Sequence, residues 1–196
     1  FEYVFERYEE QYGRTSLFEQ YIRYFKTDVS PSPYFALAAS LPWPYVYTTN
    51  QHDYFEHALR SLGIPYEPIV THMWPEPPSQ AMHLYKLNGS VSESNAHKPD
   101  VLPITSADYQ RTPGTMRLRR MRDDLYARLN KGSAILVMIH PTLQDLEDIA
   151  YHTQSDPTTA SRVYILNNVT QDAEKFKVAQ QFNPLMATPE FILELL

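Results

Sequence analysis

Residues 45–56 constrain the fold of this chain more than any other stretch of its sequence. An apolar and aromatic run is followed by the polar run Thr-Thr-Asn, and then by a helical pattern that carries Glu56. The spacing predicts a β-strand at 45–49, a polar turn, and a helix over 52–61. In an open α/β sheet, ligands bind outside the carboxyl ends of the strands. The polar turn is therefore a candidate binding site.

A second stretch repeats this order, because the strand predicted at 83–87 ends at Asn88-Gly89, a strong turn dipeptide. Amphipathic helices with a break near Gly13 are predicted over 1–26. Further strands are predicted at 65–70, 101–105, 133–139, 162–166 and 183–187, and further helices at 34–40, 116–129, 142–152, 171–181 and 188–196. The apolar run at 133–139 is typical of a central strand. The alternation predicts an α/β fold with a Rossmann-like parallel sheet flanked by helices and an N-terminal helical segment.

Composition limits the function classes. A net charge of −6 and a pI of about 5.6 argue against nonspecific nucleic-acid binding. The five glycines are isolated, so the sequence has no Gly-rich phosphate loop. Cysteine is absent, and no apolar run reaches the roughly 20 residues of a membrane span. We expect a cytoplasmic protein with one domain over 1–196, divided into a helical segment (1–40) and an α/β portion (41–196), as a fragment of a larger protein.

The two strand–turn stretches resemble the sirtuin-like family of NAD-consuming domains. That family has T-T/Q-N-x-D at the end of a strand, followed by a helix with a hydrophobic pair and a Glu. In this chain Thr49, Asn50, Asp53 and Glu56 fall in register with the family pattern.

A third match supports the resemblance. The apolar strand in 135–145 is followed by a turn in which Thr142 and Asp145 correspond to the family's G-Y/T-S-x-x-D. The order and spacing of the three matches carry the resemblance, more than the individual letters.

The chain departs from the family at three positions: His52 replaces an Asp, Asn88 replaces the His that acts as general base, and His140 replaces a Gly. An amide cannot take a proton, so general-base catalysis by Asn88 is excluded. An imidazole suits that work because its pKa lies near 7. His52 and His83 are therefore candidates for the missing base.

The resemblance implies a domain similar to the NAD-hydrolysing effector domains of prokaryotic antiviral defence systems, which cleave NAD to nicotinamide and ADP-ribose. It implies that Asn50 orients the ribose or a water, and that NAD is bound by Thr49, Asp53, Gly89, Thr142 and Asp145. The four cysteines of the zinc ribbon in sirtuin deacylases are absent, which argues against zinc-dependent protein deacylation. The histidine spacing predicts no metal site.

Other interpretations stay open. The chain can be an inactive sirtuin-like scaffold that mediates oligomerisation or partner binding. Its partners would then be other protomers or domains of a larger assembly, or a nucleic-acid-sensing protein. We expect no contact with a membrane. A nucleoside-processing or sugar-nucleotide enzyme is a third interpretation. More simply, 48–50 can be a helix N-cap and Asn88-Gly89 a plain turn. The arginine cluster at 117–122 can be a solvated or interface helix face, or a contact with nucleic acid or an acidic partner.

Overall fold

The computed structural model describes residues 2–25, 33–70, 81–92, 102–110, 112–129, 131, 134–137, 147, 151, 163–166 and 183–185. The chain forms two compact units, Phe1–Arg122 and Asp123–Leu196, and helix α6 (Thr112–Leu129) has residues in both. The single domain over 1–196 stays a prediction.

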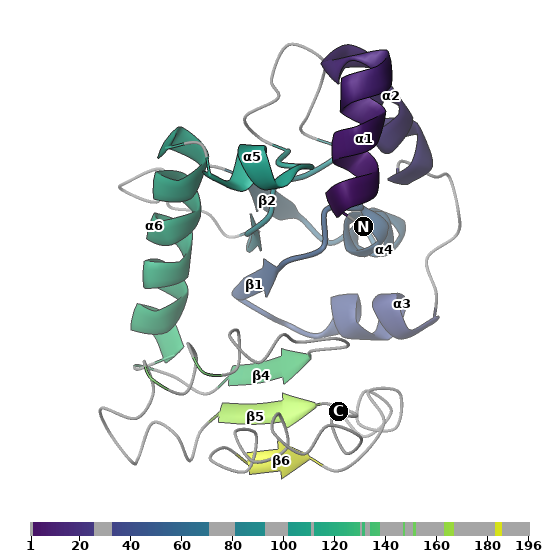
Figure 1. The fold of residues 1–196 in the computed structure, drawn as a ribbon. Coiled ribbons are helices and arrows are strands. Elements are labelled where there is room, and N and C mark those ends of the chain that lie inside the picture. The colour runs from purple at the N-terminus through teal and green to yellow at the C-terminus, as the bar shows by residue number, and fades with distance from the viewer. Residues whose placement is uncertain are drawn as a thin grey trace. The chain divides into compact units, whose positions relative to one another are not determined.

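The first unit begins with two helices, α1 (Glu2–Tyr12) and α2 (Arg14–Phe25), which pack against each other (Figure 1). Gly13 separates them with a φ of 82°, a backbone conformation that residues with a Cβ rarely adopt. The predicted break near Gly13 is confirmed. Leu17 and Phe18 of α2 are the buried residues of this helix pair.

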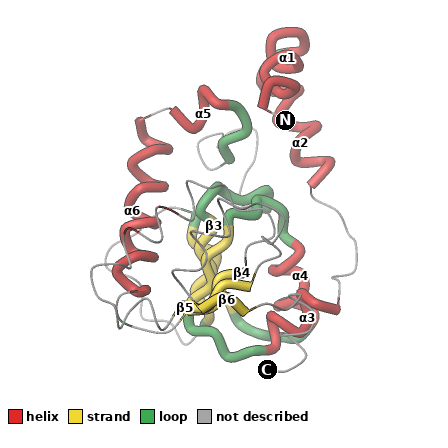
Figure 2. The backbone as a smooth tube through the Cα atoms, turned by 60° about the horizontal axis from the view of Figure 1, so that its bottom comes forward, coloured by secondary structure: helices red, strands yellow, loops and turns green. Residues whose placement is uncertain are grey.

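A three-stranded parallel sheet follows, made of β1 (Tyr45–Thr48), β2 (Tyr66–Ile69) and β3 (Met82–Lys86), with β3 between the other two. Two helices, α3 (Pro33–Ser40) and α4 (Tyr54–Ser61), lie beside each other (Figure 2). The α/β class and the parallel strand pairing are confirmed within this unit.

Strand β3 is buried along its whole length, as expected for a strand covered on both faces. Met82 and Leu84 are two positions apart and so share one face of the sheet. There they pack with Ala39 of α3 and with Ala58 and Leu59 of α4. On the other face the ring of Tyr85 stacks on Tyr47 of β1, with centroids 4.4 Å apart. This packing fixes the carboxyl end of β3 beside that of β1.

The predicted strand at 101–105 is wrong for the described residues 102–105, which form a buried loop leading into α5 (Ser106–Gln110). Pro103 has no N–H to give to a sheet. The N–H groups of Ile104 and Thr105 instead both donate to Asp108 Oδ2, at 2.9 Å each. A side chain therefore takes the hydrogen bonds that a neighbouring strand would need.

The second unit contains a parallel sheet of β4 (Ala134–Val137), β5 (Val163–Leu166) and β6 (Asn183–Leu185). Among these three described strands β5 lies between β4 and β6. The central position predicted for the strand at 133–139 stays a prediction, because the described residues are only part of this unit. The helices predicted at 171–181 and 188–196, and nearly all of that at 142–152, lie outside the described residues.

Burial predicts how the first unit responds to truncation of a side chain. Leu84 is fully buried, whereas Leu62 at the end of α4 is 45% exposed. We expect Leu84→Ala to lower the free energy of unfolding by about 2–5 kcal/mol. The matched substitution Leu62→Ala should change it by about 0.5 kcal/mol or less. Urea unfolding measures both, and equal losses would contradict the assigned core.

Candidate functional site

Two polar segments lie side by side at the carboxyl ends of β1 and β3. The first polar segment comprises residues 49–53 and the second comprises residues 87–92. Thr48 and Lys86 end their strands in register. The Leu87 N–H donates to Thr48 O at 2.9 Å, and the Val91 N–H donates to Gln51 O at 3.0 Å. The backbone therefore joins the two segments directly.

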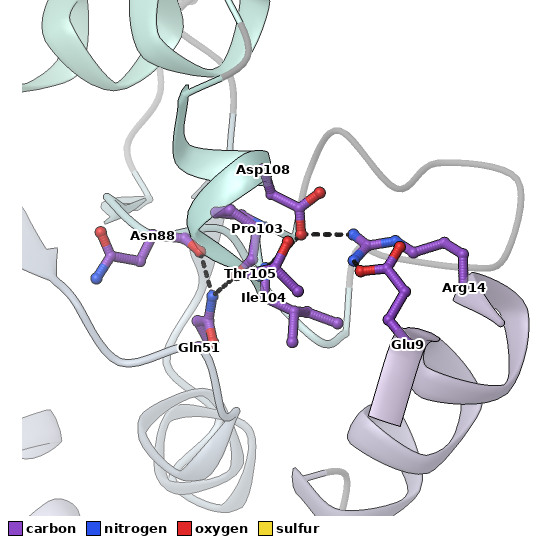
Figure 3. A network of polar contacts seen from close by, with 8 residues as sticks. All are labelled: Glu9, Arg14, Gln51, Asn88, Pro103, Ile104, Thr105 and Asp108. Atoms are coloured by element: carbon purple, nitrogen blue, oxygen red, sulfur yellow. Dashed lines mark hydrogen bonds and ion pairs between the residues drawn. The ribbon is translucent and has the colours of Figure 1, made fainter. Parts of the chain in front are cut away.

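The side chain of Gln51 adds a second connection (Figure 3). Its Nε2 donates to Asn88 O at 2.8 Å and to Pro103 O at 2.6 Å. Its Oε1 accepts a hydrogen bond from the Tyr21 hydroxyl of α2. One side-chain amide thus contacts the second segment, the loop at 102–105 and helix α2.

A buried ion pair lies beneath the segments. Lys86 Nζ is 2.7 Å from Glu56 Oε1, and the two side chains are only 1% and 2% exposed. The same ammonium donates to His52 O at 2.7 Å. Burial lowers the pKa of Lys86, while Glu56 and Asp53 oppose that shift. The pair ties α4 to β3 and holds the backbone of the first segment.

Asp53 occupies the N-cap position of α4, which begins at Tyr54 and not at residue 52. Its carboxylate makes no side-chain cap hydrogen bond. Oδ2 instead accepts from Ser92 Oγ at 2.8 Å and lies 3.3 Å from His57 Nε2. The interpretation of 48–50 as the helix N-cap is therefore wrong, and Asp53 links the two segments.

His52 is half-buried, and its ring contacts the rings of Phe35 and Tyr54. Burial lowers its pKa, and the positive charge of Lys86 adds to the effect, while Asp53 opposes it. The pKa thus lies below the usual value of about 6.5, so the imidazole is neutral at pH 7. A neutral imidazole can accept a proton.

Several buried polar atoms of the two segments and of α4 have no hydrogen-bond partner within the part of the chain that the structure describes. They are His52 Nδ1, Asp53 Oδ1, Glu56 Oε2 and Ser90 Oγ. An unpaired buried polar atom costs about 1–3 kcal/mol. The three oxygens are acceptors, and their unused capacity matches a ligand that brings hydroxyl donors.

The structure brings together most of the predicted site residues. Thr49 and Asn50 are exposed on the first segment, where the Asn50 N–H donates to Thr48 Oγ1 at 3.0 Å. The Asn88 side chain points away from Gln51 (Figure 3). Gly89 is buried in the turn that follows β3, with a φ of 83° that suits glycine.

Three predicted residues are not placed with the segments. Thr142 and Asp145 lie outside the described residues. His83, proposed as a substitute base, lies three residues before Lys86, roughly 10 Å along an extended strand. Its Nε2 is 3.9 Å from Glu67 Oε2 at the other end of the sheet.

Sequence reasoning missed Gln51, Lys86, Ser90 and Ser92 as parts of the site. Lys86 carried a signal, because a lysine at the end of an apolar strand is rarely buried without a paired carboxylate. The role of Gln51 had no comparable local signal, since its partners lie 30 to 52 positions away.

The loop at 102–105 is fixed from its other side by Asp108. Arg14 donates to Asp108 Oδ2 at 2.7 Å. Burial alone would raise the pKa of Asp108. The N–H groups of Thr105 and Ile104 and the charge of Arg14 outweigh that effect and leave the pKa lowered.

No protein-family model matches the chain, and a search of curated proteins gives no match. No helix among the described residues is both long and apolar enough to cross a membrane. Within the same residues, no group of three or more His, Asp or Glu side chains is placed to hold a metal ion.

Breaking the buried ion pair should destabilise the first unit strongly. We expect Lys86→Met to cost about 3–5 kcal/mol, because it leaves Glu56 buried without a counter-charge. Replacing both partners, as Lys86→Met with Glu56→Leu, should recover much of that loss. Urea unfolding of the two single variants and the double variant measures this coupling. Additive losses would show that the two groups do not interact.

Asp108 should make stability depend on acid pH. Because its folded pKa lies below the unfolded value of about 3.9, its contribution is full above that value and is lost as pH falls through the folded pKa. Asp108→Asn should therefore be less stable at pH 7 and lose less stability between about pH 5 and pH 2. Glu10→Gln, which removes an exposed pair with Arg7, is the control and should change little. A parallel pH profile for Asp108→Asn and the parent would refute the assignment.

Proposed function

We propose that this chain is a sirtuin-like domain that binds NAD at the carboxyl ends of β1 and β3, on a sheet of the Rossmann-like type. The observation that carries the proposal is the pair of polar segments joined across the ends of two parallel strands, where α/β folds bind ligands. The resemblance of Thr49, Asn50 and Asp53 to the family pattern supports the same place.

The chemistry of the segments fits the ribose of a nucleoside. Ribose hydroxyls are donors, and the unpaired oxygens of Asp53, Glu56 and Ser90 are acceptors. Two cations that adjoin the segments in the described part of the chain are already paired, Lys86 with Glu56 and Arg60 with Asp53. We therefore assign the ribose, and not the pyrophosphate, to this part of the site.

Hydrolysis would break the bond between ribose C1′ and the nicotinamide nitrogen. Water supplies the new oxygen, nicotinamide leaves with the bonding electrons, and one proton must be accepted. Asn88 cannot accept it. We assign this role to His52, whose neutral imidazole has an unpartnered Nδ1 among the described residues. Asn50 would orient the ribose or the attacking water.

By the same resemblance, we place the domain in a bacterial antiviral defence protein, as the cytoplasmic effector part of a larger assembly. Its partners would be other protomers or domains, with a nucleic-acid-sensing protein as a further partner.

A second candidate function is that of a sirtuin-like scaffold without catalysis. Two observations favour it. The family's general base is replaced by Asn88, and the N-terminal helices expose Tyr3, Tyr12 and Tyr24, which are 67%, 56% and 76% accessible. Exposed tyrosines of this kind are common where one protein packs on another.

The deciding experiment incubates the full-length protein, with any partner chain, with NAD and follows nicotinamide release by chromatography. We expect calorimetric binding of NAD that Asn50→Ala weakens. Any release should be lost in His52→Gln. It should also fall as the pH drops through the lowered pKa of His52, because protonation removes the base. NAD binding without release would support a binding domain that has lost catalysis. Neither binding nor release would reject the NAD proposal and favour the scaffold.

A further inference from the structure

We infer that Gln51 is a positioning residue of this site, held in place by helix α2, so that the N-terminal helices control the geometry of the two polar segments. The inference rests on the proposed NAD site for its ligand, while its geometry stands on contacts within the first unit.

The hydrogen bonds of Gln51 fix the direction of its amide. Two backbone carbonyls, Asn88 O and Pro103 O, face Nε2, and neither carbonyl can donate. The NH₂ group must therefore face them, which leaves Oε1 for the Tyr21 hydroxyl. An amide whose two N–H groups and oxygen are all engaged cannot rotate without losing hydrogen bonds, here in a half-buried setting.

Gln51 stands between Asn50 and His52, the two residues of the first segment to which the proposed chemistry is assigned. Its backbone oxygen accepts from Val91, and its side chain holds the carbonyl of Asn88. Gln51 therefore makes two of the hydrogen bonds that join the first and second segments. In a site that orients a ligand, a displacement of about 1 Å can cost on the order of a hundredfold in rate.

Helix α2 supplies the support. Leu17 and Phe18 form a buried cluster with Val91 of the second segment and with Leu102 and Ile104 of the adjoining loop. The hydroxyl that reaches Gln51 belongs to Tyr21, on the same helix.

The Tyr21 ring is itself held by Phe5 of α1 and by Phe25, with centroids 5.4 and 4.6 Å away. A shift of the helix pair would therefore move Tyr21, and with it the amide that joins the segments.

Two substitutions separate this role from simple packing. Gln51→Glu keeps the size of the side chain but brings a carboxylate against two carbonyl oxygens, which repels them. Tyr21→Phe removes only the hydroxyl and keeps the ring contacts. The control is Gln20→Glu, which makes the same change of charge at an exposed position of α2, the helix that carries Tyr21.

The experiment measures NAD affinity by calorimetry, the Tm of the free protein, and amide hydrogen exchange, on the full chain. We expect Gln51→Glu to weaken NAD binding by at least about tenfold. Tyr21→Phe should act in the same direction with a Tm within about 2 °C of the parent. In both variants, amide hydrogen exchange should become faster at the Val91 N–H and stay unchanged at the Leu84 N–H. The Gln20→Glu control should match the parent in all three measurements. If Gln51→Glu fails to fold, Tyr21→Phe decides alone.

The outcomes separate this inference from the NAD proposal. NAD binding by both variants at parental affinity would overturn the inference and leave the NAD proposal standing. A parent protein that binds no NAD would reject the NAD proposal, and exchange at Val91 would then decide about Gln51. Faster exchange in both variants keeps the positioning role, and parental exchange overturns it.

Discussion

The buried ion pair between Lys86 and Glu56 is the interaction on which the rest of the site depends. Removing two charges from water is costly, and a buried pair is stable only when both partners remain and further hydrogen bonds satisfy them. Here the ammonium also takes the carbonyl of His52. The pair thereby couples the position of helix α4, the end of β3 and the backbone of the first segment. Neither α4 nor the end of β3 can shift alone without separating the two charges, and a shift of the first segment would break the hydrogen bond from Lys86 to His52 O.

Much of the first unit could be predicted from local pattern, and its exception has a physical cause. The run at 45–48 and the turn at Asn88-Gly89 gave the right strands because their signals are local: alternation, burial and turn chemistry. The stretch 102–105 is equally apolar, and its pattern is that of a strand. It forms a loop because Pro103 lacks an N–H and because Asp108 captures the next two N–H groups. Arg14, 94 positions away, also donates to this carboxylate, and no local window contains that contact.

The candidate site could likewise be predicted only in part. The resemblance located both polar segments, and Asn50, His52, Asp53, Asn88 and Gly89 do come together at the strand ends. Gln51 was overlooked because its three hydrogen-bond partners lie in α2, the second segment and the loop before α5, and only the fold brings them together. Asp53 was expected at the site, but its links to Ser92 and His57 appear only once the chain is folded. Pattern reasoning thus finds residues that carry chemistry more readily than residues that hold them in place.

In the proposed sirtuin-like site, Asn88 in place of the family's histidine bears differently on binding and on catalysis. The framework uses only the backbone carbonyl at position 88, which any residue supplies, and the side chain points away from Gln51. A change of side chain there removes a proton acceptor and leaves the hydrogen bonds between the segments as they are. A general base is one side chain at the edge of a site, whereas ligand geometry depends on the whole connected framework. In the proposed NAD site, the loss of a base at position 88 therefore leaves the binding surface in place, and the proposed hydrolysis falls to the neutral imidazole of His52.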